Sequence, residues 1–87
     1  MESKSEINKY DNKVWKLLNG KCHREDGPAI EYNDGSKAWF INGKLHREDG
    51  PAIEYSNGAK SWYLNDIKYS EQEYKHQIRL IKLDKIL

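Results

Sequence analysis

The chain contains a single cysteine, Cys22, so it cannot form an internal disulfide bond. It also has no run approaching the roughly 20 apolar residues that a membrane-spanning helix needs. Its first 12 residues are polar and lack the apolar segment of a secretory signal peptide. From these absences we expect a cytoplasmic protein that has no membrane partner.

The chain has almost no net charge. Its 15 basic and 14 acidic side chains give a formal charge of +1, so we expect no basic surface for nucleic acid or an anionic membrane. At 87 residues it makes one domain, near the size at which a single core is barely sufficient. Three tryptophans, six tyrosines and one phenylalanine supply large apolar surfaces that disordered chains lack. The composition therefore predicts one small folded domain with a polar surface.

One stretch of sequence occurs twice. Residues 19–32 read Asn-Gly-Lys-Cys-His-Arg-Glu-Asp-Gly-Pro-Ala-Ile-Glu-Tyr, and residues 42–55 differ only in having Leu45 in place of Cys22. An offset of about 23 residues is typical of repeats that stack and bury their apolar faces against one another. The matching Leu45 indicates that Cys22 fills a packed apolar position. A tandem repeat displays each surface group twice, which is typical of recognition surfaces and not of catalytic centres.

Turn signals divide each repeat into short strands. Trp39-Phe40-Ile41 is an aromatic and β-branched run, and the Asn42-Gly43 pair after it is the strongest short signal for a tight hairpin. We predict a mainly β domain in which antiparallel β-hairpin repeats form a meander over residues 13–69. The charged residues 1–12 before it are expected to be a flexible lead-in.

The segment 70–87 is expected to cap the sheet with a helix and a tail. Ser70 and Glu73 make a capping-box pattern, which predicts a helix over residues 71–83. Because both faces of the expected sheet are partly apolar, we expect the helix to cover one of them. A second apolar stripe on the far side of the helix consists of Leu80, Leu83 and Leu87. This stripe either forms a homodimer interface or wraps back onto the domain.

The aromatic strand, the Asn-Gly-Lys-x-His turn and the later Asn/Asp-Gly turn resemble the MORN repeat (membrane occupation and recognition nexus). They resemble more closely variant repeats with a His-Arg-Glu-Asp-Gly-Pro-Ala core, found in small proteins of bacteria, phages and large viruses. The resemblance covers about residues 14–69, but Arg24 and Arg47 stand where MORN units have glycine. It implies hairpin scaffolds that serve as binding surfaces. In its most specific form it implies a phage-encoded inhibitor that blocks a host defence or regulatory protein sterically.

The repeated His-Arg-Glu-Asp-Gly tract has two main interpretations. In the structural one, the aspartates accept hydrogen bonds from their own turns, the glycines relieve backbone strain, and His23 and His46 bond neighbouring carbonyl groups. Those turn residues are Asp26, Gly27, Asp49 and Gly50. In the second, side chains of both copies contact a protein partner, with arginine forks on its carboxylates. The candidate partner-binding residues are Arg24, Glu25, Arg47, Glu48, Trp39 and Trp62.

Two further interpretations stay open. The histidine loops could hold a metal ion or a small ligand, although zinc needs about four ligands in tetrahedral geometry. The Trp39–Trp62 and Phe40–Tyr63 pairs could stack the bases of single-stranded nucleic acid, for which the few neighbouring lysines give modest support. No reactive side chain completes a catalytic triad. We therefore predict a non-enzymatic protein-interaction module with no cofactor and no bound metal.

Overall fold

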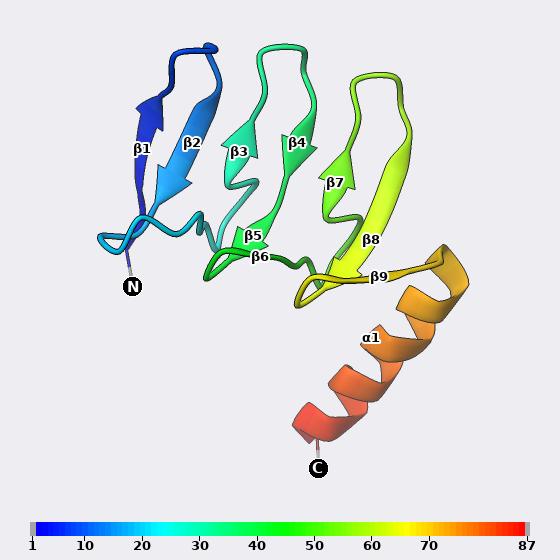
Figure 1. The fold of residues 1–87 in the computed structure, drawn as a ribbon. Helices are drawn as coiled ribbons and strands as arrows, with labels where there is room; N and C mark the ends of the chain where they lie inside the picture. The colour runs from blue at the N-terminus through cyan, green and yellow to red at the C-terminus, as the bar shows by residue number, and fades with distance from the viewer. Residues whose placement is uncertain (1, 87) are drawn as a thin grey trace.

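The computed structural model describes residues 2–86, which form a single-layer antiparallel sheet followed by one helix (Figure 1). The sheet has seven strands in the order β1-β2-β3-β4-β7-β8-β9, and β5 pairs with β6 separately. The strands are β1 (Lys4–Ile7), β2 (Lys13–Lys16), β3 (Ile30–Glu31), β4 (Lys37–Ala38), β5 (Phe40–Ile41), β6 (Lys44–Leu45), β7 (Ile53–Glu54), β8 (Lys60–Leu64) and β9 (Ile67–Tyr69). The helix α1 spans Glu71–Ile86. The predicted mainly β hairpin meander with a C-terminal helix is confirmed.

Three long hairpins stand side by side in the sheet: β1–β2, β3–β4 and β7–β8 (Figure 1). The turns of the second and third hairpins are closed by equivalent backbone hydrogen bonds. Gly35 N–H donates to Tyr32 O at 3.0 Å, and Gly58 N–H donates to Tyr55 O at 2.9 Å. Both glycines have a positive φ, 93° and 90°, which glycine adopts at little cost. The turn signals of the sequence therefore mark the upper ends of these hairpins.

The first hairpin contains a strand, β1, in the segment that the sequence predicts to be a flexible lead-in. Lys4–Ile7 pairs with β2 along its whole length. Its turn is a variant of the repeated one, because Asp11 with a φ of 63° takes the place of the glycine and donates its N–H to Asn8 O at 3.1 Å. The expectation for residues 1–12 does not hold over this strand, because the altered turn hides the periodicity.

At the lower end of the sheet the Asn-Gly turn joins the repeats. Asn42 and Gly43 have φ values of 50° and 80°, as a type I′ hairpin turn requires. Gly43 N–H donates to Cys22 O at 2.8 Å, and one repeat later Asp66 N–H donates to Leu45 O at 2.9 Å. Each turn is therefore bonded to the same backbone position of the preceding repeat.

The register of the sheet sorts its side chains onto two faces, since residues opposite one another in neighbouring strands share a face. One row alternates in charge from strand to strand: Lys13, Glu31, Lys37, Glu54 and Lys60. We call the side that carries this row the charged face. By the alternation of strand residues, Trp39 lies on this face.

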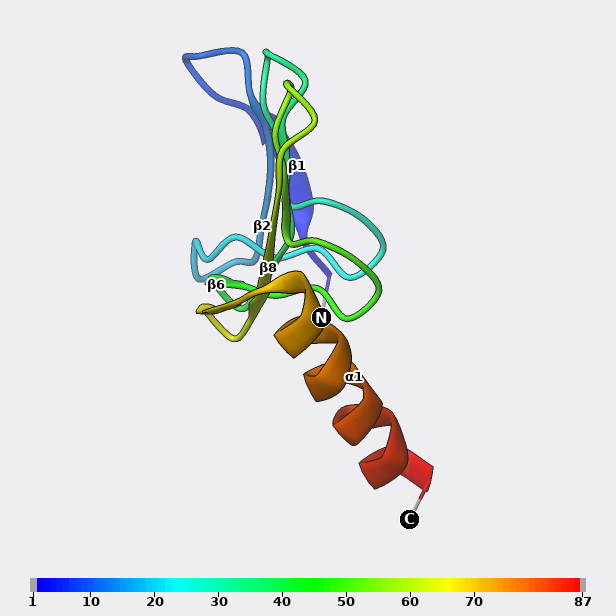
Figure 2. The same cartoon turned by 90° about the vertical axis from the view of Figure 1, so that its right-hand side faces the viewer.

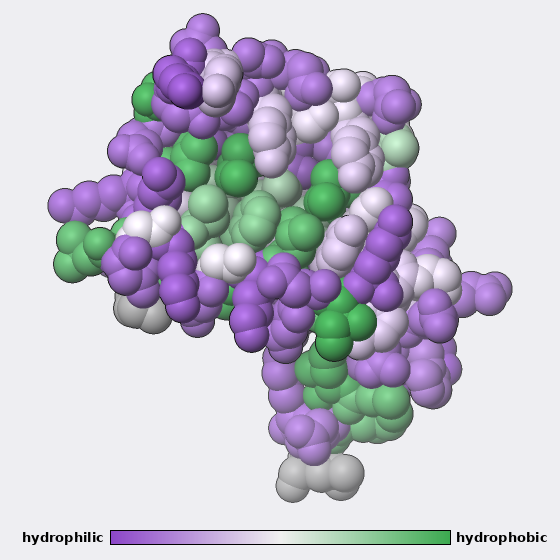
Figure 3. Space-filling model, in the orientation of Figure 1, coloured by the Kyte–Doolittle hydropathy of each residue, from purple (hydrophilic) through white to green (hydrophobic). Residues whose placement is uncertain are grey.

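The opposite side is apolar at its centre. Its middle row is Val14, Ile30, Ala38, Ile53 and Ser61. Ala38 and Ile53 also line a shallow hollow of about 390 Å³ together with Tyr32, Phe40, Leu45 and Tyr55. We call the apolar members of these two sets the apolar face. Figure 3 shows apolar side chains gathered over the middle strands of the sheet, surrounded by polar ones.

The core of the molecule is thin. The smallest extent of the molecule is 17 Å, and the edge-on view in Figure 2 shows the sheet as one layer. The buried apolar residues are Val14, Leu17, Ala29, Ala38, Ala52, Leu64 and Tyr74. Among residues 2–86 no large side chain is fully buried, and three of these seven residues are alanines.

The helix α1 begins where the sequence predicts it. Ser70 N–H donates to Glu73 Oε1 at 3.1 Å and Glu73 N–H donates to Ser70 Oγ at 3.2 Å, which confirms the capping box. The helix continues to Ile86, beyond the predicted end at residue 83. In the described part of the chain, no helix is long and apolar enough to cross a membrane.

The position of α1 differs from the expectation. Figures 1 and 2 show that it leaves the sheet beside β9 and points away from it, so it covers neither face. The prediction that the helix covers one face of the sheet is therefore wrong. Leu80 and Leu83 are 46% and 51% exposed, and do not wrap back onto the domain. The third leucine of the predicted stripe, Leu87, lies outside the described residues.

Candidate functional site

The two His-Arg-Glu-Asp-Gly tracts form neighbouring loops at the lower end of the sheet. We call residues 23–27 the first loop and residues 46–50 the second loop. Figure 2 shows both loops bulging to the side of the sheet toward which α1 also points. Between them lies an open groove of about 920 Å³, lined by both loops, by Trp39 and Ile41, and by Lys82 of α1. We call it the loop groove.

Each loop is held by its arginine. The Arg47 guanidinium lies 3.8 Å from the centre of the Trp39 ring. Its Nε donates to Asp49 Oδ1 at 2.9 Å, and its Nη1 donates to the Pro51 carbonyl at 3.0 Å and to Glu54 Oε2 at 2.9 Å. The planar guanidinium group, with its N–H donors in fixed directions, suits this set of acceptors better than the ammonium group of a lysine would. The fork therefore ties the second loop to β7 and to the tryptophan of the charged face.

The first loop repeats this arrangement almost atom for atom. Arg24 lies 3.8 Å from the centre of the Trp15 ring, and its Nε donates to Asp26 Oδ1 at 3.0 Å. Its Nη1 donates to the Pro28 carbonyl at 3.2 Å, while Glu31 Oε2 lies farther away at 3.4 Å. The sequence predicts that both arginines contact a protein partner. In the structure they are 22% and 19% exposed and bind groups of their own chain.

The glycines and aspartates of the loops have roles other than those predicted. Gly27 and Gly50 are not among the positive-φ residues of the described chain, so they relieve no backbone strain. A Cβ at Gly50 would lie 2.9 Å from Arg47 Cζ, and the same distance separates a Cβ at Gly27 from Arg24 Cζ. These glycines make room for the stacked arginines. Asp26 and Asp49 accept hydrogen bonds from arginine and not from their own turn backbone.

The histidines hold the next repeat. His23 Nδ1 accepts a hydrogen bond from Asn42 N–H at 2.9 Å, and His46 Nδ1 accepts one from Asn65 N–H at 3.1 Å. The prediction that they bond carbonyl groups is wrong, because each Nδ1 accepts from a backbone N–H, while Nε2 of His46 lies against Glu48 and Nε2 of His23 has no hydrogen-bond partner. His23 is 2% exposed. Each histidine thus joins its loop to the hairpin turn that follows.

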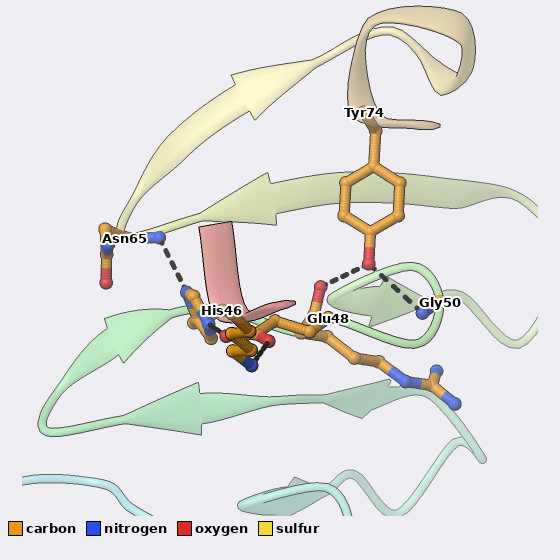
Figure 4. Close-up of polar contacts among 7 residues, drawn as sticks. His46, Glu48, Gly50, Asn65 and Tyr74 are labelled. Atoms are coloured by element: carbon orange, nitrogen blue, oxygen red, sulfur yellow. Dashed lines mark hydrogen bonds and ion pairs between the residues drawn. The ribbon is translucent and has the colours of Figure 1, made fainter. Parts of the chain in front are cut away.

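The two loops differ at the histidine Nε2. In the second loop, His46 Nε2 lies 3.0 Å from Glu48 Oε2 (Figure 4). Lys85 of α1 donates to Glu48 Oε1 at 3.0 Å. The hydrogen bond from His46, and after it that from Lys85, hold the pKa of Glu48 below its ordinary value. In the first loop, His23 Nε2 is buried without a hydrogen-bond partner and lies 3.5 Å from Glu25 Oε1.

Tyr74 fixes α1 against the second loop. Its hydroxyl donates to the carbonyl of Arg47. It also accepts from Gly50 N–H at 3.2 Å, as Figure 4 shows. The side chain is 4% exposed, and burial raises the pKa of its phenol. The hydrophobic-staple position of Tyr74 after Ser70 predicts a packed tyrosine, but nothing in the sequence indicates that it reaches a loop 24 residues earlier.

Five of the six candidate partner-binding residues meet at the loop groove. They are Arg24, Glu25, Trp39, Arg47 and Glu48, whereas Trp62 does not line the groove. Ile41 and Lys82 also line it and were not predicted, although Ile41 follows from the alternation with Trp39. With the arginines bound internally, the exposed charges that line the groove are the carboxylates of both loops and the ammonium group of Lys82. The side chain of Glu25 is 68% exposed, and those of Asp26 and Asp49 are each 87% exposed.

The other predicted chemistries find little support in this geometry. Within residues 2–86, no three His, Cys, Asp or Glu side chains are grouped so that they could hold a metal ion. The guanidinium of Arg47 lies over Trp39, so that face of the ring is not free to stack a nucleotide base. Burial raises the pKa of the Cys22 thiol, which disfavours the reactive thiolate.

Comparison of the chain with protein-family models, curated proteins and solved structures gives no match.

Proposed function

We propose that the protein is a non-enzymatic interaction module whose loop groove binds basic side chains of a protein partner. The observation that carries this proposal is that exposed carboxylates outnumber exposed cations in the lining of the loop groove. Each loop arginine is bound to its own chain, where it pairs with one oxygen of Asp26 or Asp49, while Glu25 and the remainder of each aspartate carboxylate stay exposed. A cation from a partner would meet these carboxylates above the apolar surface of Trp39 and Ile41.

The repeat also sets the spacing of the partner's charges. Successive loops are two strands apart in the sheet, because the first loop leads into β3, the second leads into β7, and β4 lies between these two strands. At about 4.8 Å between strands, equivalent carboxylates of the two loops lie roughly 10 Å apart. An extended peptide spans this distance in about three residues. The partner therefore presents two lysine or arginine side chains about three residues apart, or in equivalent positions on a folded surface.

The most specific form of the proposal is a phage-encoded inhibitor that docks on a host defence or regulatory protein in the cytoplasm and blocks it sterically. It rests on the resemblance of the His-Arg-Glu-Asp-Gly-Pro-Ala tract to repeats in small phage and bacterial proteins. A pull-down from the host cytoplasm, with the captured proteins identified by mass spectrometry, tests this form. Capture that yields no defence or regulatory protein would leave the inhibitor role without support.

The groove itself is tested with an array of short peptides of varied sequence. We expect bound peptides to be enriched in lysine and arginine at a spacing of about three residues, with binding that weakens as salt is added. The variant Glu25→Lys reverses a charge that is 68% exposed and whose carboxylate lies 3.5 Å from His23 Nε2. We expect it to weaken binding about tenfold or more.

Asp84→Lys is the matched control, because it changes the net charge equally at an exposed position of α1. It should bind the same peptides as the original chain. Enrichment of acidic or apolar peptides, or equal binding by the Glu25→Lys variant, would rule out the loop groove as the binding site.

A further inference from the structure

The two loops have the same sequence, but only one of their glutamates holds a lysine. In the second loop both oxygens of the Glu48 carboxylate are bound: His46 Nε2 lies 3.0 Å from Oε2, and the Lys85 ammonium group donates to Oε1 at 3.0 Å. In the first loop the equivalent carboxylate, that of Glu25, pairs with no lysine or arginine of the described residues. The second loop therefore shows which kind of group the repeated tract can hold.

The first loop also contains a buried nitrogen without a partner. His23 is 2% exposed, and its Nε2 makes no hydrogen bond and lies 3.5 Å from Glu25 Oε1. Because its Nδ1 accepts from Asn42 N–H, the proton of the neutral ring is on Nε2. A buried donor that lacks an acceptor is destabilising. If Glu25 moved to the 3.0 Å separation of the second loop, it would supply this acceptor.

The Glu25 carboxylate is accessible from the loop groove. Its side chain lines the groove and is 68% exposed, whereas that of Glu48, which Lys85 contacts, is 44% exposed. Lys82 of α1 lines the same groove, but no ion pair joins it to Glu25 in the described part of the chain. A side chain of another molecule can therefore reach Glu25 through the open side of the groove.

The histidine beside the carboxylate decides which cation fits. A lysine ammonium group is a compact charge that can donate to one carboxylate oxygen and leave the other for the histidine, as Lys85 does at Glu48. An arginine guanidinium group prefers to donate to both oxygens of a carboxylate at once. At Glu25 that pairing would compete with Nε2 of His23 and leave the buried nitrogen without its acceptor. The first loop is therefore better suited to lysine than to arginine.

We propose that the first loop is a receptor for one lysine side chain of the protein partner, which donates to Glu25 while His23 Nε2 donates to the other oxygen of the same carboxylate. The bound state then has the arrangement of Lys85, Glu48 and His46 in the second loop. The receptor depends on the proposed binding of basic side chains in the loop groove, to which it adds the kind of cation and the atoms that hold it.

Calorimetric titration with two matched peptides tests the receptor. Both are short chains of alanine and glycine, one with two lysines about three residues apart and the other with two arginines in the same places. We expect the original chain to bind the lysine peptide about fivefold more tightly. Glu25→Gln, a change at an exposed side chain, should bind both peptides about equally. If neither peptide binds, the proposed function fails as well. If the original chain binds both equally, or prefers arginine, the groove still binds basic side chains and only the lysine receptor is wrong.

The nitrogen resonances of the histidine rings report on the site directly. As the lysine peptide is added, the signal of His23 Nε2 is expected to shift, because its proton gains an acceptor. The Nε2 signal of His46, which already lies against Glu48, is the internal comparison and should shift less. An unchanged His23 signal at saturation would overturn the proposal.

Lys82→Gln is the control for the lysine that already lines the groove, and this variant should keep the preference for the lysine peptide. A preference that appears only in this variant would show that Lys82 itself occupies Glu25, and it would equally overturn the proposal.

Discussion

The arginine of each repeat shows what sequence can and cannot reveal about a single residue. The position of Arg47 in a turn between strands is evident from its neighbours, and so is the proximity of Asp49. Its stacking on Trp39 is not evident, because the ring reaches the loop only through the folded backbone, where Trp39 N–H donates to Ala52 O at 2.7 Å. A charged side chain in a turn is usually solvated. The sequence therefore does not reveal that the arginines bind groups of their own chain, and their contact with a partner stays a prediction.

Replacing Arg47 with lysine tests the fork. The variant keeps the charge but loses the paired donors to Asp49, Pro51 and Glu54, and we expect a loss of about 1–3 kcal/mol in the free energy of unfolding. Arg24→Lys should cost less, because Arg24 Nη1 lies 3.4 Å from Glu31 Oε2. Urea denaturation measures both values. The exposed Arg79→Lys is the control and should lie within about 0.5 kcal/mol of the original chain.

The Glu48 carboxylate predicts a dependence of stability on pH. Its pKa is lowered in the folded state, first by the hydrogen bond from His46 and then by that from Lys85. The folded chain then binds fewer protons than the unfolded chain, so this contribution is present above the ordinary value of 4.5 and is lost as the pH falls below it. Glu48→Gln removes the titrating group. Unfolding measured between about pH 3 and pH 6 should show a shallower acid-side loss of stability in that variant, and an unchanged slope would contradict the assignment.

At the scale of the element, α1 combines a predictable beginning with an unpredictable position. The capping box involves only Ser70 and Glu73, which are three residues apart, so the sequence is sufficient to find it. The docking of the helix depends on Tyr74 and Lys85, which contact residues far earlier in the chain. Amphipathic pattern alone indicates that a helix face is buried, but not which element buries it.

Tyr74→Phe removes the hydroxyl that links α1 to the second loop. The Arg47 carbonyl and Gly50 N–H would lose a hydrogen-bond partner in a partly buried place, and we expect a cost of about 1–3 kcal/mol. Hydrogen exchange of the α1 amides should quicken in parallel, because the helix would detach more often. Tyr10→Phe, at a 62% exposed position, provides the comparison and should change neither quantity.

At the scale of the whole molecule, the repeat determines most of the architecture. The 23-residue period and its turn signals predict the hairpins of residues 13–69, and the structure confirms the meander. The single-layer arrangement could not be predicted, since both faces of the strands carry apolar residues. Whether a second layer covers a face of the sheet depends on contacts between elements far apart in the sequence. The alternation of apolar and polar residues within one strand does not indicate such contacts.

Lengthening the array tests whether the repeats behave as stacked units. A second copy of residues 42–64 inserted after Leu64 preserves the junction with Asn65 and every bond between neighbouring repeats. Because stability in such arrays grows with each interface, we expect a higher melting temperature, and a urea m-value larger by about a quarter, in proportion to chain length. An unchanged m-value would show that the added unit does not join the cooperative structure.

The alanines of the thin sheet have a consequence for how this protein tolerates variation. Ala29 and Ala52 have no exposed surface, and their carbonyls accept hydrogen bonds from Trp15 and Trp39. Where the interior is one side chain deep, nothing behind these positions can shift to admit an extra methyl group. Evolution could therefore alter an exposed aromatic residue such as Tyr10 more freely than either of these alanines.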